Sequence, residues 1–245
     1  MNELNFENAN YQILQENCLD GMRKIKNETI DCIICDPPYG MEFQSNWVDS
    51  DKRKNKIIGD ERPFIWFLYE SFRILKNNSF LICFCEWKRQ EIFKMALNAA
   101  GFKVRSQGVW DRMVHGMGDL KGGLAPSHDL FWLATKGKPI FFGKRLNSVL
   151  RYQRIDPAKL VHPAEKPVPL LRELIRSCSP YGGIVFDPMA GSGTTGQAAI
   201  MEGRKFLGFE LDGAYVDIAK NRVSYVAENQ FDIKNTIQKT LFDFI

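Results

Sequence analysis

Residues Phe186–Gly196 read FDPMAGSGTTG, and this stretch decides the fold. Phe186 and Asp187 end a short apolar run, and the glycines that follow permit a tight turn into a helix without side-chain obstruction. Ten residues later, Phe206–Glu210 (FLGFE) is a second short apolar run with an acid at its carboxyl end, 23 residues after Asp187. The order strand, glycine-rich turn, helix, strand and acid is the outline of a βαβ unit that binds a nucleoside.

The glycine-rich turn has two other readings. Its three glycines match the spacing of the dinucleotide pattern G-x-G-x-x-G, but Asp187-Pro188 and Thr194-Thr195 are not typical of dinucleotide sites. Such a turn also joins a strand to a helix where no ligand binds, and Glu210 alone is consistent with a surface acid. The spacing between the turn and Glu210 favours the nucleoside pocket, in which Glu210 accepts hydrogen bonds from both ribose hydroxyls.

Outward from this unit, apolar runs alternate with helical patterns, which predicts an α/β fold with a mainly parallel sheet. We expect strands over residues 29–35, 79–85, 104–110, 129–134, 184–186 and 206–209. We expect helices over residues 63–75, with Pro63 in the first turn, 87–100, 167–178, 194–202 and, capped by Asp212, to about residue 227.

A second motif, Asp36-Pro37-Pro38-Tyr39, follows the strand over residues 29–35 and so lies at the carboxyl edge of the sheet. Prolines lack an amide donor but keep a carbonyl acceptor. The Asp36 carboxylate and the Pro37 carbonyl are suited to accept the two N–H bonds of an amino group, and Tyr39 offers a flat ring. The alternative is a Pro-Pro turn that Asp36 caps.

Composition limits the class of protein. The chain has 245 residues, of which 44% are hydrophobic and 25% charged, as in one large globular domain. No apolar run approaches the roughly 18 residues that a membrane helix needs, and residues 1–11 are polar and acidic, so we expect a cytoplasmic protein. Of six cysteines, Cys32 and Cys35 have zinc-like spacing. A strand would point them to opposite faces, so we expect no metal site.

Basic charge gathers in residues 136–161, which hold seven basic residues and one acidic residue, a net charge of +6 in a chain of net charge +4. With three aromatic residues nearby, this segment suits a nucleic-acid backbone, although a solvated loop is equally consistent with the charge alone. The basic residues of this segment that are candidates for such contacts are Lys144, Arg145, Arg151 and Arg154.

The two motifs, in this order, resemble the S-adenosylmethionine-dependent amino-methyltransferases of DNA in the permuted arrangement called the beta class. His162–Pro167 (HPAEKP) resembles a third family element, His-Pro-Thr-Gln-Lys-Pro, and departs from it at Ala164-Glu165. Asn17–Met22 (NCLDGM) resembles the element before the first strand. The resemblance covers Asn17 to about Arg222. It implies one Rossmann-like methyltransferase domain over residues 1–245, with about seven strands, the catalytic half first and the cofactor half last.

The resemblance also implies roles for single residues. Lys166 would approach the carboxylate of the cofactor's methionine portion, and Asp20 would accept from the amino group of its adenine. Tyr39 would stack on a base flipped out of the duplex. The catalytic residues implied are Asp36, Pro37, Pro38 and Tyr39. The cofactor-binding residues implied are Asp20, Asp36, Lys166, Asp187, Ala190, Gly191, Ser192, Gly193, Thr194 and Glu210.

The family's target-recognition region corresponds to about residues 112–161, with residues 41–62 as a second DNA-facing loop. The implied substrate is adenine N6 in duplex DNA, because aspartate opens the tetrapeptide where cytosine-N4 enzymes more often have serine. Methylation of cytosine N4, methylation of RNA, and a DNA-binding module without catalysis are the alternatives. A homodimer is an assembly that such enzymes often adopt.

Overall fold

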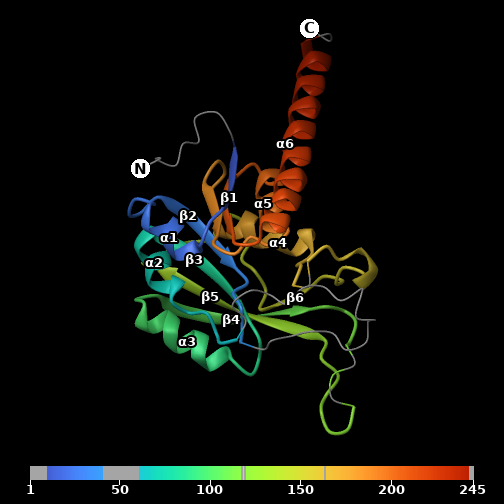
Figure 1. Ribbon diagram of the computed structural model, residues 1–245. Coiled ribbons are helices and arrows are strands. Elements are labelled where there is room, and N and C mark those ends of the chain that lie inside the picture. The colour runs from blue at the N-terminus through green and yellow to red at the C-terminus, as the bar shows by residue number, and fades with distance from the viewer. Residues whose placement is uncertain (1–9, 41–60, 117, 119, 163, 243–245) are drawn as a thin grey trace.

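The protein is a three-layer α/β structure, in which helices cover both faces of one sheet (Figure 1). The computed structural model describes residues 10–40, 61–116, 118, 120–162 and 164–242, with side chains to residue 229. The sheet has eight strands in the order β1-β8-β7-β2-β3-β5-β4-β6. Their bounds are β1 Tyr11–Gln15, β2 Ile30–Cys35, β3 Leu75–Cys85, β4 Lys103–Asp111, β5 His128–Lys136, β6 Val149–Arg151, β7 Ile184–Asp187 and β8 Lys205–Glu210.

The sheet is mainly parallel, as the alternation of patterns predicts. Strand β5 runs antiparallel to β3 and β4, and the other neighbouring pairs are parallel. Eight strands replace the seven expected because β6, only three residues long, pairs with β4 from within the basic segment. Strand β1 was also not predicted, because this edge strand buries only its central residue, Ile13.

Two buried clusters, one on each face, hold the helices to the sheet. One face carries α1 Cys18–Arg23, α2 Phe67–Ile74 and α3 Gln90–Ala99, and the other carries α4 Val168–Cys178, α5 Thr194–Met201 and α6 Gly213–Phe242. In β2, Cys32 and Ile34 join one cluster while Ile33 and Cys35 join the other. The prediction that Cys32 and Cys35 face opposite ways is therefore confirmed.

Two helix boundaries differ from expectation. Helix α2 begins at Phe67 and not near Pro63, because Pro63 forms a β-bridge with Tyr39 and the Phe64 amide donates to the Pro38 carbonyl at 3.0 Å. Helix α6 continues to Phe242 and projects beyond the rest of the domain (Figure 1). No glycine or proline follows Gly213, so the two residues that most strongly end a helix are missing from this part of the sequence.

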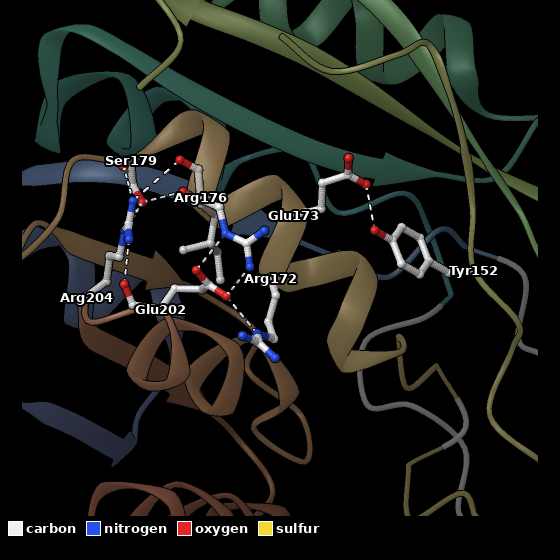
Figure 2. A network of polar contacts seen from close by, with 8 residues as sticks. Tyr152, Arg172, Glu173, Arg176, Ser179, Glu202 and Arg204 are labelled. Carbon is white, nitrogen blue, oxygen red and sulfur yellow. Dashed lines mark hydrogen bonds and ion pairs between the residues drawn. The ribbon is translucent and has the colours of Figure 1, made fainter. Parts of the chain in front are cut away.

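A polar network fixes α4 against the end of α5 (Figure 2). The Glu202 carboxylate, with 8% of its side chain exposed, pairs with Arg172 and Arg176 of α4, each at 2.7 Å. The hydrogen bonds from Arg176 hold the pKa of Glu202 below its ordinary value. Arg204 donates to the Ser179 carbonyl at 2.7 Å. These contacts brace the face of the sheet under the glycine-rich turn.

Candidate active site

The two motifs meet in the middle of the sheet. The acceptor turn (residues 36–39) follows β2, the glycine turn (residues 187–193) follows β7, and these two strands are direct neighbours. Strands β3, β5, β4 and β6 lie on one side of this pair, and β8 and β1 on the other. The strand that follows β2 in the sequence therefore extends the sheet on one side, and the strand that follows β7 extends it on the other. Ligands of open α/β sheets bind at the carboxyl ends of strands at such a switch point.

Both oxygens of the Asp36 carboxylate are already engaged. The Tyr39 hydroxyl donates to Oδ1, and the Lys166 ammonium donates to Oδ2 and forms an ion pair with it. Burial, reinforced by the Asp36 charge, raises the pKa of Tyr39 well above its ordinary value, so its hydroxyl stays a donor. A carboxylate offers about four lone-pair sites. Asp36 therefore retains capacity to accept further hydrogen bonds.

The two prolines of the acceptor turn differ in their carbonyls. The Pro38 carbonyl accepts from the Phe64 amide, and Tyr39 pairs with Pro63, so this side of the turn is closed by the segment before α2. Among the residues that the structure describes, none donates a hydrogen bond to the Pro37 carbonyl. The Pro37 carbonyl therefore lies beside the Asp36 carboxylate with both of its acceptor sites left available by the described residues.

Lys166 lies deeper than its sequence pattern suggests. The residue is 8% exposed, and its Nζ also donates to the Ala164 carbonyl at 3.3 Å and lies 5.0 Å from the centre of the Phe84 ring. An ammonium has three donors. Two of them are used by Asp36 and Ala164, so one is left to face the cavity.

The glycine turn adopts backbone conformations that favour glycine. Gly191 has φ +50° and Gly193 has φ +81°, both in the left-handed region. The Gly191 amide donates to Glu210 Oε2 at 2.8 Å, and the Ala190 amide donates to the Phe209 carbonyl at 2.8 Å. The turn is thereby fastened to the end of β8. A Cβ on Gly193 would lie 2.7 Å from the Ala219 Cβ, so Gly193 lets the turn pack closely on α6.

Glu210 is placed at the carboxyl end of β8, beside the glycine turn. Its Oε1 accepts from the amides of Leu211 at 2.8 Å and Asp212 at 3.0 Å, and its Oε2 accepts from Gly191. Three of about four acceptor sites are thus used. The remaining site is sufficient for one ribose hydroxyl, where the sequence pattern suggested two.

Asp187 ends β7 and is 4% exposed. Its carboxylate accepts from the Met189 amide at 3.1 Å. Burial nevertheless raises the pKa of Asp187 to about 7, with smaller contributions from the charges of Asp36 and Glu210. A carboxyl that titrates near neutrality in a cavity is a functional-site signal.

One cavity of about 820 Å³ connects these groups. This volume is within the roughly 300–1,000 Å³ typical of small-molecule sites. The predicted site residues that line it are Asp36, Pro37, Pro38, Tyr39, Arg154, Lys166, Asp187, Ala190, Gly191, Ser192, Thr194 and Glu210.

Asp20, for which the resemblance implies a contact with the cofactor's adenine, is not among the residues that line this cavity. Its carboxylate is 58% exposed and pairs with Arg23 at 3.0 Å, one helical turn away on α1. Asn17 and Cys18, from the same sequence element, do line the cavity. The short helix α1 turns Asp20 outward because the positions that it buries are Cys18, Gly21 and Met22.

The basic segment is divided between two ends of the sheet. Arg151 ends β6, parallel to β4, and Arg154 lines the cavity. In contrast, the Lys144 carbonyl accepts from Ser177 Oγ at 2.9 Å, at the end of α4 farther from Lys166. The eleven residues of α4 span roughly 16 Å. Lys144 and its neighbour Arg145 therefore lie away from the cavity.

Three residues that line the cavity, Trp87, Arg112 and Asp129, were not among the predicted site residues. Arg112, after β4, and Asp129, in β5, form a two-pronged ion pair with Arg112 Nε 3.0 Å from Asp129 Oδ2. Trp87, 60% exposed, follows β3 at the rim. Trp87 and Arg112 could have been found, because each follows a strand that ends at the site. Asp129 could not, since it reaches this edge only because β5 runs antiparallel.

The second DNA-facing loop was expected over residues 41–62. Of this range, residues 41–60 lie outside the described residues.

The acceptor turn and a glycine turn of the nucleoside-binding type thus share one cavity at the switch point, which is the arrangement of an α/β protein with a nucleoside site. Within the described residues, no helix is long and apolar enough to cross a membrane.

Comparison with known proteins gives the family. The N6_N4_Mtase family model, described as DNA methylase, matches residues 30–221. The protein YubD of Escherichia coli (strain K12), named as a methylase, is 30% identical over 218 residues, which cover 88% of this chain and 91% of YubD. This chain therefore belongs to the DNA methylase family, which confirms the resemblance.

Solved structures agree on the fold. The crystal structure of the M1.HpyAVI–SAM complex matches with a TM-score of 0.66 at 22% identity, covering 86% of this chain and 99% of that chain. The PvuII DNA methyltransferase, titled cytosine-N4-specific, matches with a TM-score of 0.70 at 16% identity, covering 90% and 92%. The predicted methyltransferase fold is thus confirmed.

Proposed function

We propose that this S-adenosylmethionine-dependent DNA methyltransferase acts on the exocyclic N6 of adenine, in a base flipped out of duplex DNA. The observation that carries the proposal is that Asp36 and Pro37, with acceptor capacity left, share one cavity with the glycine turn and Glu210. We assign residues 1–245 to a single domain in which residues 112–161 contain the target-recognition segment.

The residues present fit the cofactor. Glu210 has one acceptor site for a ribose hydroxyl, and Lys166 has one donor for the carboxylate of the methionine portion. The glycine turn brings backbone close to the ligand without side chains at Gly191. M1.HpyAVI, with the same fold, was solved in complex with SAM.

The acceptor turn can make an exocyclic amino nitrogen more nucleophilic. An exocyclic amino nitrogen is a poor nucleophile because its lone pair is delocalised into the ring. When the Asp36 carboxylate and the Pro37 carbonyl accept its two N–H bonds, they favour a tetrahedral nitrogen whose lone pair points out of the ring plane. When bound, the cofactor would supply a methyl group carried on a cationic sulfur, and the sulfur would keep the electron pair of the broken carbon–sulfur bond. Asp36, hydrogen-bonded to the nitrogen, then accepts its extra proton and passes it to water.

The choice of base rests on Asp36 as the first residue of the tetrapeptide. The name of the family covers both N6 and N4 methylation, and the PvuII neighbour is titled cytosine-N4-specific. Cytosine N4 is therefore the second candidate, because its amino group presents the same two N–H bonds to Asp36 and Pro37.

The test is transfer of a labelled methyl group to unmethylated duplex DNA, single-stranded DNA and RNA, followed by digestion to nucleosides and identification by mass. We expect N6-methyladenine from duplex DNA. N4-Methylcytosine would keep the mechanism and change the base, and a product from RNA alone would change the substrate class. Tight cofactor binding without any product would instead indicate a module without catalysis.

Arg151 and Arg154 are expected to carry DNA contacts that Lys144 and Arg145 do not. Replacing the two arginines by alanine should weaken duplex binding and reduce the salt slope (log Kd against log salt) by about 2, if each contacts one phosphate. The double variant Lys144→Ala/Arg145→Ala removes the same charge from the other end of α4 and should leave the slope unchanged. Fluorescence anisotropy at several salt concentrations measures both. Equal reductions of the salt slope in the two variants would show that Arg151 and Arg154 do not carry DNA contacts of their own.

Binding of the cationic cofactor is expected to depend on pH through Asp187. With a pKa of about 7, this carboxyl must lose its proton to favour a positive ligand in the cavity, so affinity should rise as pH increases through 7. S-Adenosylhomocysteine lacks the sulfonium charge but shares the other titrating groups. The affinity for S-adenosylmethionine divided by the affinity for S-adenosylhomocysteine, measured by calorimetry between about pH 5.5 and 8.5, should therefore increase with pH. Asp187→Asn should flatten it, and a flat ratio in the wild type would contradict the assignment.

A further inference from the structure

Glu165 and Lys166 are adjacent in sequence but contact opposite halves of the site, the cofactor half and the catalytic half. Lys166 pairs with Asp36 of the acceptor turn. Glu165 pairs with Arg222 of α6, with Glu165 Oε1 2.7 Å from Arg222 Nη1. The Glu165 side chain is 5% exposed and that of Arg222 is 18% exposed, so the pair is shielded from water. A buried carboxylate of this kind depends on its partner.

The pair is tied to the glycine turn. Arg222 also donates to Ser192 Oγ at 3.3 Å. Glu165 Oε2 accepts from the amides of Val161 at 3.0 Å and His162 at 3.3 Å. These hydrogen bonds join the start of the loop over residues 161–166 to Glu165 near its end. One carboxylate and one guanidinium therefore join this loop, α6 and the glycine turn.

The loop also lies over the glycine turn. The His162 ring meets the Tyr215 ring of α6 edge to face at 4.5 Å, and a Cβ on Gly191 would lie 3.5 Å from the His162 ring. The loop thus rests on the cofactor half through His162 and Glu165, and it reaches the catalytic half through Lys166.

The charge of Glu165 distinguishes this chain from the pattern that it resembles, His-Pro-Thr-Gln-Lys-Pro. A glutamine at this position could accept from the Val161 amide but could not form an ion pair with Arg222. The Glu165–Arg222 pair is therefore a property of this sequence.

On the basis of the proposed function, we propose that Glu165 and Arg222 are positioning residues that hold Lys166 between the glycine turn and Asp36, and so set the separation of methyl donor and acceptor. Lys166 has one donor left for the cofactor while it holds Asp36. A shift of the loop would move this donor and the Asp36 carboxylate together, which would affect the rate more than the binding of DNA.

The test is a double-mutant cycle of Arg222→Gln, Glu165→Gln and the combined variant, with Arg222→Lys as the conservative change. Arg222→Gln leaves the Glu165 carboxylate buried without its partner. We expect kcat to fall on the order of 10- to 100-fold, affinity for S-adenosylhomocysteine to fall roughly 3- to 10-fold, and KM for DNA to stay within about twofold. The combined variant should recover most of both losses because it removes the unpaired charge, and Arg222→Lys should keep most of the rate.

Glu202→Gln is the matched control, since it also removes a buried glutamate that pairs with arginine, but in the network between α4 and α5 (Figure 2). It should lower the melting temperature without changing kcat or ligand affinity. If the two single substitutions at residues 165 and 222 are additive, or if folded Arg222→Gln binds ligand and turns over as the wild type does, the inference is wrong. Should the wild type methylate no DNA, the proposed function fails, whereas the calorimetric cycle still tests the positioning pair.

Discussion

Replacing Asp36 by alanine is expected to reduce kcat for methyl transfer on the order of 10³-fold, while affinity for S-adenosylhomocysteine falls far less, through the loss of the partner that holds Lys166. The substitution removes one of the two acceptors that orient the amino group and the charge that favours the developing cation on its nitrogen. It also leaves the Lys166 ammonium without its carboxylate in a site where Lys166 is 8% exposed. Single-turnover transfer, together with calorimetry, separates the rate from the binding.

Asp36→Asn is the matched control for this prediction. The amide keeps the shape of the side chain and one oxygen that can accept from Tyr39, but it loses the charge that pairs with Lys166. We expect a rate between those of the wild type and the alanine variant. Melting temperatures of both variants exclude unfolding as the cause, and a near-normal rate in folded Asp36→Ala would rule out the acceptor mechanism.

Gly191→Val is expected to lower affinity for S-adenosylmethionine and S-adenosylhomocysteine by about 100-fold or more. The backbone at Gly191 is left-handed, which costs an L residue roughly 1–2 kcal/mol and a β-branched one more. Relief of this strain would turn the amide away from Glu210, to which it donates at 2.8 Å, and the new side chain would press on the His162 ring, which lies 3.5 Å from a Cβ at this position. Isothermal titration calorimetry of the folded variant measures the loss.

Gly182→Val separates backbone strain from damage to the site. Gly182 also has a left-handed backbone, with φ +73°, but a Cβ there would meet nothing within 4 Å, and the residue does not line the cavity. This variant should lose a similar amount of stability and keep its ligand affinity. If both valine variants bind ligand equally well, the glycine turn is not the cofactor site.

The sequence determined the central features of this protein because they depend on local chemistry. The apolar runs over residues 32–35, 80–85 and 184–186 specify the buried parts of β2, β3 and β7, and the glycines between β7 and α5 specify a turn that other residues cannot adopt without strain. Asp36 and Asp187 each end such a strand. Parallel strands bring their carboxyl ends to one edge, so their convergence follows from the sequence pattern.

Other features depend on contacts between segments distant in sequence, and only the tertiary structure decided them. The pattern expected Lys166 to serve the cofactor, but folding places it against Asp36, 130 positions away. The reversed direction of β5 brings Asp129 to the cavity, and the hydrogen bond from Ser177 Oγ to the Lys144 carbonyl holds that part of the basic segment at the far end of α4. The outward turn of Asp20 has a similar origin, because α1 must bury Met22. Sequence spacing specifies which strand a residue follows, whereas the direction of its neighbours and the face that a helix buries are set by packing across the whole sheet.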